Sequence, residues 1–139
     1  MTRFVLDASF AVSWIVESER TPERLRYLDA LTSGKAQAFV PALWADEMGN
    51  VLLTMERAKK LNATQVAAWV EVYCRLPIEI DPSSIDHSLG DVCRIARAHG
   101  LSLYDARYLH LAMREKLPLA TLDRQLLKSA AKVGVSSVS

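Results

Sequence analysis

The sequence predicts an α/β domain with a short central parallel sheet of four to five strands and helices packed against it. The first observation is that short apolar runs alternate with longer stretches of helical periodicity, which is typical of parallel sheets. The second is size, because 139 residues, 50% of them hydrophobic, can bury a sizeable core without disulfides. The third is that no repeat or long Pro/Gly/Ser-rich linker divides the chain. We therefore expect residues 1–139 to form a single domain.

The elements follow in order from these patterns. The expected strands are Arg3–Asp7, Ala36–Val40, Pro77–Ile80 and Pro118–Leu122, with Val135–Val138 as a fifth. The expected helices cover residues 8–17, 22–33, 42–60, 63–76, 84–99, 103–116 and 124–132. Residues placed as helix N-caps are Thr21, which precedes a proline, Asn62 and Ser102. Glycines at which helices should stop are Gly34, Gly100 and Gly134.

Bulk properties indicate a cytoplasmic protein without a membrane segment. Cys74 and Cys93 lie in apolar helical patterns and in no CxxC pair, so we expect reduced thiols that behave as small hydrophobic side chains. Asp7 interrupts the apolar N-terminus and no small-residue cleavage site follows, which argues against a signal peptide. No segment reaches the ~20 apolar residues of a membrane helix. A net charge of +1 neither favours nor excludes a nucleic-acid partner.

Two expected strands end in an aspartate where a helix begins. Asp7 follows the apolar run Phe-Val-Leu, and Asp123 follows Leu-Ala-Thr-Leu. Ligands of an open parallel sheet bind beyond the carboxyl ends of the strands, so both carboxylates should face one crevice. Each aspartate would also suit a helix N-cap, and this alternative stays open.

Two further acids lie on expected helices. Glu47 and Asn50 are three residues apart and share a helix face, whereas Asp46 points about 100° away. The alternative for Glu47 is a solvated position on the rim of its helix. Asp105 lies three residues after Ser102, in a spacing close to a capping box, and that role is compatible with binding a cation.

A cluster of these four carboxylates implies a metal ion. Like charges close together raise one another's pKa, so a converging set needs a neutralising cation. Oxygen ligands without a partnering His or Cys favour Mg²⁺ or Mn²⁺ over Zn²⁺. His87, His99 and His110 show no HExxH spacing, and we expect no ligand role for them.

Four motifs together resemble the PIN domain, in particular the VapC-like toxins of bacterial toxin-antitoxin pairs. The motifs are FVLDAS with Asp7 and Ser9, PALWADEMGN with Glu47 and Asn50, GLSLYDARYLHLA with Asp105, and LATLDRQL with Thr121 and Asp123. Their order and spacing cover essentially the whole chain.

The resemblance implies a three-layer α/β/α fold and a Mg²⁺- or Mn²⁺-dependent endoribonuclease that hydrolyses RNA phosphodiester bonds. It implies that Asp7, Glu47, Asp105 and Asp123 are catalytic, with Asp7 and Asp105 as the principal metal ligands. It assigns supporting polar roles to Ser9, Asn50 and Thr121. It also implies a homodimer and a small antitoxin partner encoded beside the gene.

The main alternative is a non-catalytic regulatory module of the phospho-acceptor receiver type. Receivers also have acids at strand ends, but they need an acidic pair after the first strand, where this chain has Asp7-Ala8-Ser9. A haloacid-dehalogenase-type phosphatase is excluded in the same way, because Asp7-Ala8-Ser9 lacks the second aspartate that such enzymes need. A PIN fold used only for protein binding is the third alternative, and the intact acidic set argues against it.

Overall fold

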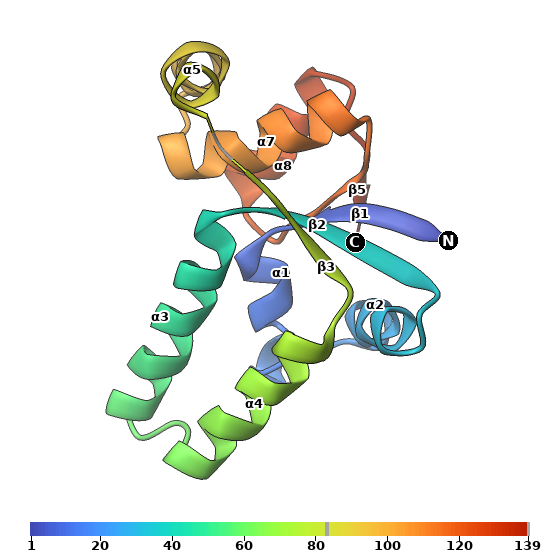
Figure 1. The fold of residues 1–139 in the computed structure, drawn as a ribbon, viewed down its shortest axis with the longest axis vertical. Helices are drawn as coiled ribbons and strands as arrows, with labels where there is room; N and C mark the ends of the chain where they lie inside the picture. Colours follow the sequence, from blue (N-terminus) through green and yellow to red (C-terminus); the bar gives the residue numbers. More distant parts are fainter. Residues whose placement is uncertain (83, 139) are drawn as a thin grey trace.

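The computed structural model describes residues 1–82 and 84–138 and is built on a five-stranded sheet (Figure 1). The strands are β1 Thr2–Leu6, β2 Ala36–Pro41, β3 Ile78–Asp81, β4 Leu119–Ala120 and β5 Ser137–Val138. Their order is β3-β2-β1-β4-β5, and every neighbouring pair is parallel. The predicted α/β class with a short parallel sheet is confirmed, and β1 lies at its centre.

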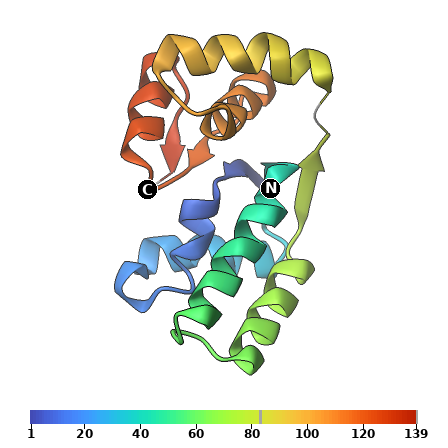
Figure 2. The ribbon, with the colours of Figure 1, turned by 90° about the vertical axis from the view of Figure 1, so that its left-hand side faces the viewer.

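Helices cover both faces of the sheet (Figures 1 and 2). One face carries α1 Ala8–Val12, α2 Pro22–Thr32, α3 Leu43–Arg57 and α4 Ala63–Arg75. The other carries α6 Cys93–His99, α7 Leu103–Glu115 and α8 Arg124–Lys132. The arrangement is therefore the three-layer α/β/α fold that the resemblance implies.

The core lies where the central strand meets both helical layers. Phe4, Val5 and Leu6 of β1 are fully buried, because helices cover both sides of this strand. Below the sheet, the rings of Trp14 and Tyr73 stack at a centroid distance of 6.2 Å and join the turn after α1 to α4. The segment that follows the carboxyl end of β1 is therefore packed into the core.

Helix ends follow the predicted signals. Thr21 accepts a hydrogen bond from the Arg24 N–H, and Asn62 forms a complete capping box with Gln65. Ser102 likewise caps α7. The glycines with positive φ after helices are Gly34, Gly100 and Gly134, as predicted.

The first predicted helix, residues 8–17, is shorter than expected. It ends at Val12, where the Ser13 hydroxyl donates to the Phe10 carbonyl and competes with the helical pattern. The Arg20 side chain then donates to the Trp14 carbonyl at 3.1 Å and satisfies an acceptor beyond the helix. A short 3₁₀ turn, η1 Glu17–Glu19, follows instead.

The fourth predicted strand, Pro118–Leu122, is also shorter. β4 stops at Ala120 because the next backbone groups bond to side chains rather than to a neighbouring strand. The Leu122 N–H donates to Ser9 Oγ at 2.9 Å, and the Asp123 N–H donates to Thr121 Oγ1 at 3.1 Å. At the crevice, hydrogen bonds to side chains therefore replace the backbone hydrogen bonds that would have continued the strand.

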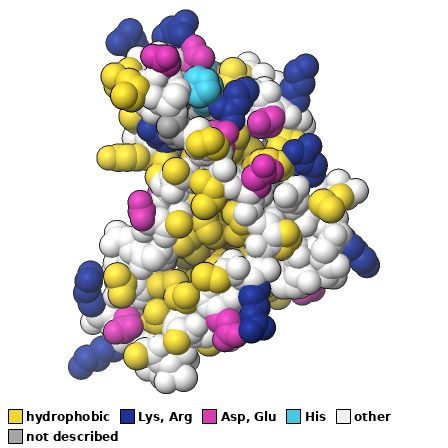
Figure 3. All heavy atoms as spheres, in the orientation of Figure 1, with side chains coloured by type: hydrophobic (Ala, Val, Ile, Leu, Met, Phe, Trp, Pro, Cys, Tyr) yellow, Lys and Arg dark blue, Asp and Glu magenta, His cyan; other side chains and the backbone are white. Residues whose placement is uncertain are grey.

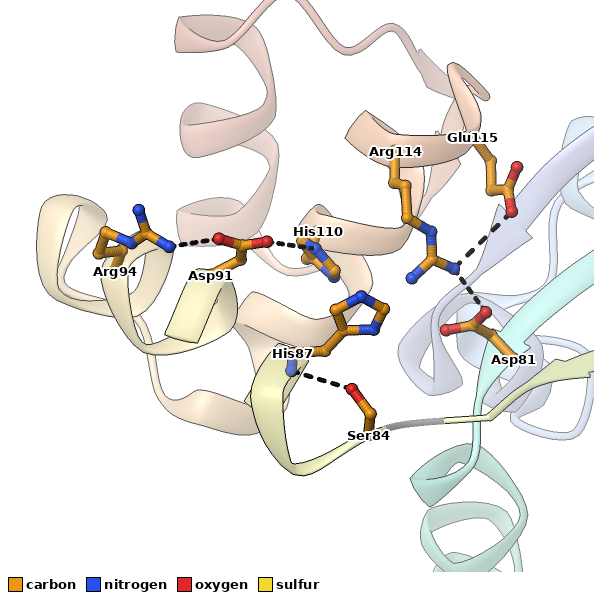
Figure 4. A network of polar contacts seen from close by, with 8 residues as sticks. All are labelled: Asp81, Ser84, His87, Asp91, Arg94, His110, Arg114 and Glu115. Atoms are coloured by element: carbon orange, nitrogen blue, oxygen red, sulfur yellow. Dashed lines mark hydrogen bonds and ion pairs between the residues drawn. The ribbon is translucent and has the colours of Figure 1, made fainter. Parts of the chain in front are cut away.

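The predicted helix 84–99 contains a turn of π-helix. It consists of α5 Ile85–His87, the π turn η2 Ser88–Val92 and α6. Polar contacts tie this segment and the end of β3 to α7, as Figure 4 shows. Arg114 of α7 forms an ion pair with Asp81 of β3 at 2.5 Å. His110, also on α7, has a lowered pKa because it is partly buried and lies near the positive charge of Arg114.

The face of the molecule that is turned to the viewer in Figure 1 carries an apolar groove. Figure 3 shows hydrophobic side chains gathered near the middle of this face. The groove has a volume of about 340 Å³ between α3, α4 and β3, and Cys74 lines it as an exposed thiol rather than a packed one. Among the helices of residues 1–82 and 84–138, none is long and apolar enough to cross a membrane.

Candidate active site

Asp7 lies at the carboxyl end of the central strand and is 5% exposed. Its N–H continues the β1–β4 ladder by donating to the Ala120 carbonyl at 2.9 Å. Its carboxylate makes no capping bond to the described residues of α1, so the N-cap alternative is wrong for this side chain. Instead, Oδ2 accepts hydrogen bonds from Ser9 Oγ and from Thr121 Oγ1, both at 2.6 Å.

The hydroxyl groups of Ser9 and Thr121 both donate their hydrogen bonds to the Asp7 carboxylate. Each hydroxyl has one proton, and both protons go to Asp7, so the 3.2 Å contact between the hydroxyls is proximity rather than a further donor bond. The lone pairs of the same hydroxyls accept the Leu122 and Asp123 N–H groups. The two side chains therefore fix both the Asp7 carboxylate and the start of the loop after β4.

Burial raises the pKa of Asp7 above its ordinary value. The Ser9 and Thr121 hydroxyls act in the opposite direction because they stabilise the charged form, and the negative charge of Asp123 adds to the increase. A buried carboxylate with this environment gains from a cation at its exposed side.

Asp123 keeps the role that its sequence position also suggested. It is the N-cap of α8, and its Oδ1 accepts the Leu126 N–H at 2.9 Å. The side chain nevertheless lines the cleft beside Ser9. One carboxylate oxygen is thus used for the fold, and the residue contributes its charge to the site.

Glu47 comes from the opposite wall, on α3. It lines the cleft together with Asn50, whereas Asp46 is exposed elsewhere on the helix, as the predicted helix faces require. Its Oε1 accepts a hydrogen bond from the Tyr108 hydroxyl at 2.5 Å. Burial raises the pKa of Glu47 most, the Tyr108 bond lowers it, and the charges of Asp7 and Asp105 raise it further.

Asp105 lies in the first turn of α7. Its N–H donates to Ser102 Oγ at 3.1 Å, so the helix cap predicted here is present. Burial raises the pKa of the Asp105 carboxyl, followed by the charges of Asp123 and Asp7, while the Ser102 hydroxyl lowers it. Two of the other three acids are therefore close enough to influence this group.

The crevice between these elements has a volume of about 570 Å³. Its lining residues are Ala8, Ser9, Val12, Glu19, Glu47, Asn50, Val51, Leu122 and Asp123. Asp7 is not among them, but its carboxylate is hydrogen-bonded to Ser9, which is. Asp105 is coupled to the set through its charge rather than as a lining residue.

The donor chemistry fits a hard divalent cation. In the described part of the chain, no group of three or more His, Cys, Asp or Glu side chains is arranged so that it could hold a metal ion by itself. Mg²⁺ is usually held by one or two carboxylates and keeps several waters, so an open set of oxygen donors suits it. Asp7 and Asp105 could hold such an ion, with Glu47 and Asp123 acting through water.

Two cleft residues were not predicted from the sequence. Tyr108 is fully buried and its hydroxyl reaches Glu47, a contact that a buried tyrosine three residues after Asp105 could have suggested, because buried phenols need partners. Glu19 enters the cleft lining from η1, and no pattern in the sequence indicated it.

Comparison with known proteins agrees with the fold. The family model described as PIN domain matches residues 4–133. The crystal structure of PAE2754 from Pyrobaculum aerophilum superposes with a TM-score of 0.70 at 25% identity, covering 99% of this chain and 84% of that one. The crystal structure of FitAcB from Neisseria gonorrhoeae gives a TM-score of 0.66 at 14% identity, with coverage of 98% and 96%, and shows likeness of fold alone. No curated protein matches the sequence significantly.

Proposed function

The chain belongs to the PIN domain family, a superfamily of nucleases, and we propose that it is a Mg²⁺- or Mn²⁺-dependent endoribonuclease acting as the toxin of a toxin-antitoxin pair. The observation that carries the catalytic proposal is the convergence of Asp7, Glu47, Asp105 and Asp123 from four separate segments. The charge of Asp123 raises the pKa of Asp7, those of Asp7 and Asp105 raise the pKa of Glu47, and those of Asp123 and Asp7 raise the pKa of Asp105. Acids with purely structural roles would have no reason to lie close enough together for their charges to shift one another's pKa values. The receiver alternative loses its support because the family is a nuclease family.

The residues of the chain would divide the work of phosphodiester hydrolysis. When bound, a divalent cation lowers the pKa of water and stabilises negative charge on the phosphate. Asp7 and Asp105 would hold the cation, and Ser9 and Thr121 would keep Asp7 in its orientation. Glu47 or Asp123 would orient the attacking water, and the Asn50 amide would contact the substrate at the rim of the crevice.

A cleavage assay tests the proposed activity. We expect the purified chain to cut RNA internally in Mg²⁺ or Mn²⁺ and to stop in EDTA. Asp105→Asn should abolish cleavage, whereas Asp46→Asn, on the exposed face of α3, should leave it unchanged. Cleavage that survives Asp105→Asn would rule out the proposed site, and phosphorylation by acetyl phosphate without cleavage would favour a receiver instead.

The biological assignment needs a separate test. The resemblance of four motifs to VapC-like toxins supports an antitoxin partner, a homodimer and a cytoplasmic location. We expect the product of a small adjacent gene to co-purify with the chain and to inhibit cleavage. Light scattering of the chain alone should give twice its mass of 15.5 kDa. A monomer would contradict the dimer, and an adjacent product that neither binds nor inhibits would contradict the toxin assignment.

A further inference from the structure

One hydrogen bond joins α7 to the wall of the crevice that α3 forms. The hydroxyl of Tyr108 on α7 donates to Oε1 of Glu47 on α3 at 2.5 Å, across 61 residues of sequence. α3 lies on one face of the sheet and α7 on the other (Figure 1), so the contact joins the two helical layers. It connects a residue of the acidic set to a residue outside it.

The two partners differ sharply in their freedom to move. Tyr108 is 0% exposed, as are Ala106 and Leu109 on the same helix, so its ring belongs to the core. Glu47 is only partly buried and has a long, flexible side chain that otherwise reaches a wide, open cleft. The rigid phenol therefore determines where the carboxylate lies, rather than the reverse.

The bond uses only one of the two carboxylate oxygens of Glu47. Oε1 accepts the hydrogen bond from the phenol, and because an ionised carboxylate can accept on both oxygens, Oε2 can still accept from water or bind a cation. The same arrangement occurs at Asp7, where the hydroxyls of Ser9 and Thr121 both bond Oδ2. In each case a hydroxyl group that is not itself acidic fixes an acid from behind.

We propose that Tyr108 is a positioning residue that holds the Glu47 carboxylate in place for cation and water binding in the crevice. The proposal rests on the proposed function of the same site. Tyr108 touches neither substrate nor cation in this role and acts only through Glu47. Residues that hydrogen-bond to the side chains of a metal site typically contribute roughly 10- to 100-fold to metal affinity.

The test compares two buried tyrosines. Tyr108→Phe removes only the hydroxyl. Tyr73→Phe removes the hydroxyl of another buried tyrosine, which donates to the backbone carbonyl of Ala11 at 2.7 Å rather than to a carboxylate. We expect Tyr108→Phe to raise the dissociation constant for Mn²⁺, measured by calorimetry on the full chain without RNA, by roughly 10- to 100-fold. Tyr73→Phe should bind Mn²⁺ like the wild type.

A double-mutant cycle identifies the route of the effect. In a Glu47→Ala background, Tyr108→Phe should change Mn²⁺ affinity no further, because the partner is already absent. Unchanged affinity in Tyr108→Phe, an equal loss in Tyr73→Phe, or a Tyr108→Phe protein that fails to fold would each overturn the proposal. Because Mn²⁺ binding is measured without RNA, a chain that shows the expected affinity pattern but cuts no RNA would contradict only the ribonuclease proposal.

Discussion

The carboxyl ends of β1 and β4 look alike in sequence and differ in structure. Each is an apolar strand that ends in an aspartate before a helix. The Asp7 carboxylate is buried and accepts two side-chain hydroxyls, whereas that of Asp123 caps α8 through the Leu126 N–H. The difference comes from Thr121, which reaches Asp7 from 114 residues away. The same local pattern therefore serves a site at one strand end and mainly a helix at the other.

Replacing Asp7 should give the largest effect. Asp7→Asn removes the buried charge, so we expect RNA cleavage to fall by more than about 100-fold, beyond the losses typical of outer partners. The metal-free protein should at the same time melt at a higher temperature at pH 7, because burial disfavours the ionised form. Calorimetry in EDTA checks this, and a lower melting temperature would show that the charge supports the fold.

Removing the hydroxyl that distinguishes the two strand ends should have the next effect. Thr121→Val takes one donor from Asp7 and one acceptor from the Asp123 N–H, so Mn²⁺ affinity should fall by roughly 10- to 100-fold. Thr121→Ser retains the hydroxyl and is the control. Equal affinities in the two variants would remove Thr121 from the explanation of the difference.

Asp123 can be separated into its two roles. Asp123→Asn retains a capping oxygen, and Asp123→Ala does not, so only the alanine variant should lose about 1 kcal/mol of unfolding free energy in urea. Both should lose cleavage activity, because both remove the carboxylate charge. A stable Asp123→Asn protein that still cleaves RNA would show that Asp123 serves only as the N-cap of α8.

The pH dependence of the Asp7 effect should be the smallest and most specific. The folded pKa of Asp7 is raised, so this group contributes stability below its unfolded value of 3.8 and loses that contribution as the pH rises through the folded pKa. The stability advantage of Asp7→Asn over the wild type, measured in EDTA, should therefore vanish near pH 3.8 and grow towards neutrality. An advantage that is constant with pH would assign it to a cause other than ionisation.

These contrasts also show what sequence patterns can predict. Asp7, Glu47 and Asp123 were predicted from strand ends and helix faces, because periodicity determines which way a side chain points. Which aspartate caps its helix could not be predicted, because the answer depends on Thr121 across the sheet. Tyr108 was missed for a related reason, since a tyrosine in an apolar helix is ordinary core until its partner on another helix is known.

Termini of elements were predicted less well where side chains compete with backbone. The first helix ends early because the Ser13 hydroxyl bonds the Phe10 carbonyl, and β4 ends early because the Ser9 and Thr121 hydroxyls accept the N–H groups of Leu122 and Asp123. Propensity describes the backbone alone, so it extends both elements too far. The error at β4 falls on the active crevice itself.

The pairing of β1 with β4 also bears on the order of events during synthesis. The first strand emerges from the ribosome early, but the partner that completes its carboxyl end begins only at Leu119. Until residues 119–123 have been translated, Asp7 lacks the Thr121 hydroxyl and the crevice lacks Asp123. A nascent chain therefore lacks the complete acidic set until this segment has been translated, so any activity that needs Asp7 and Asp123 together can begin only after residue 123 has been added.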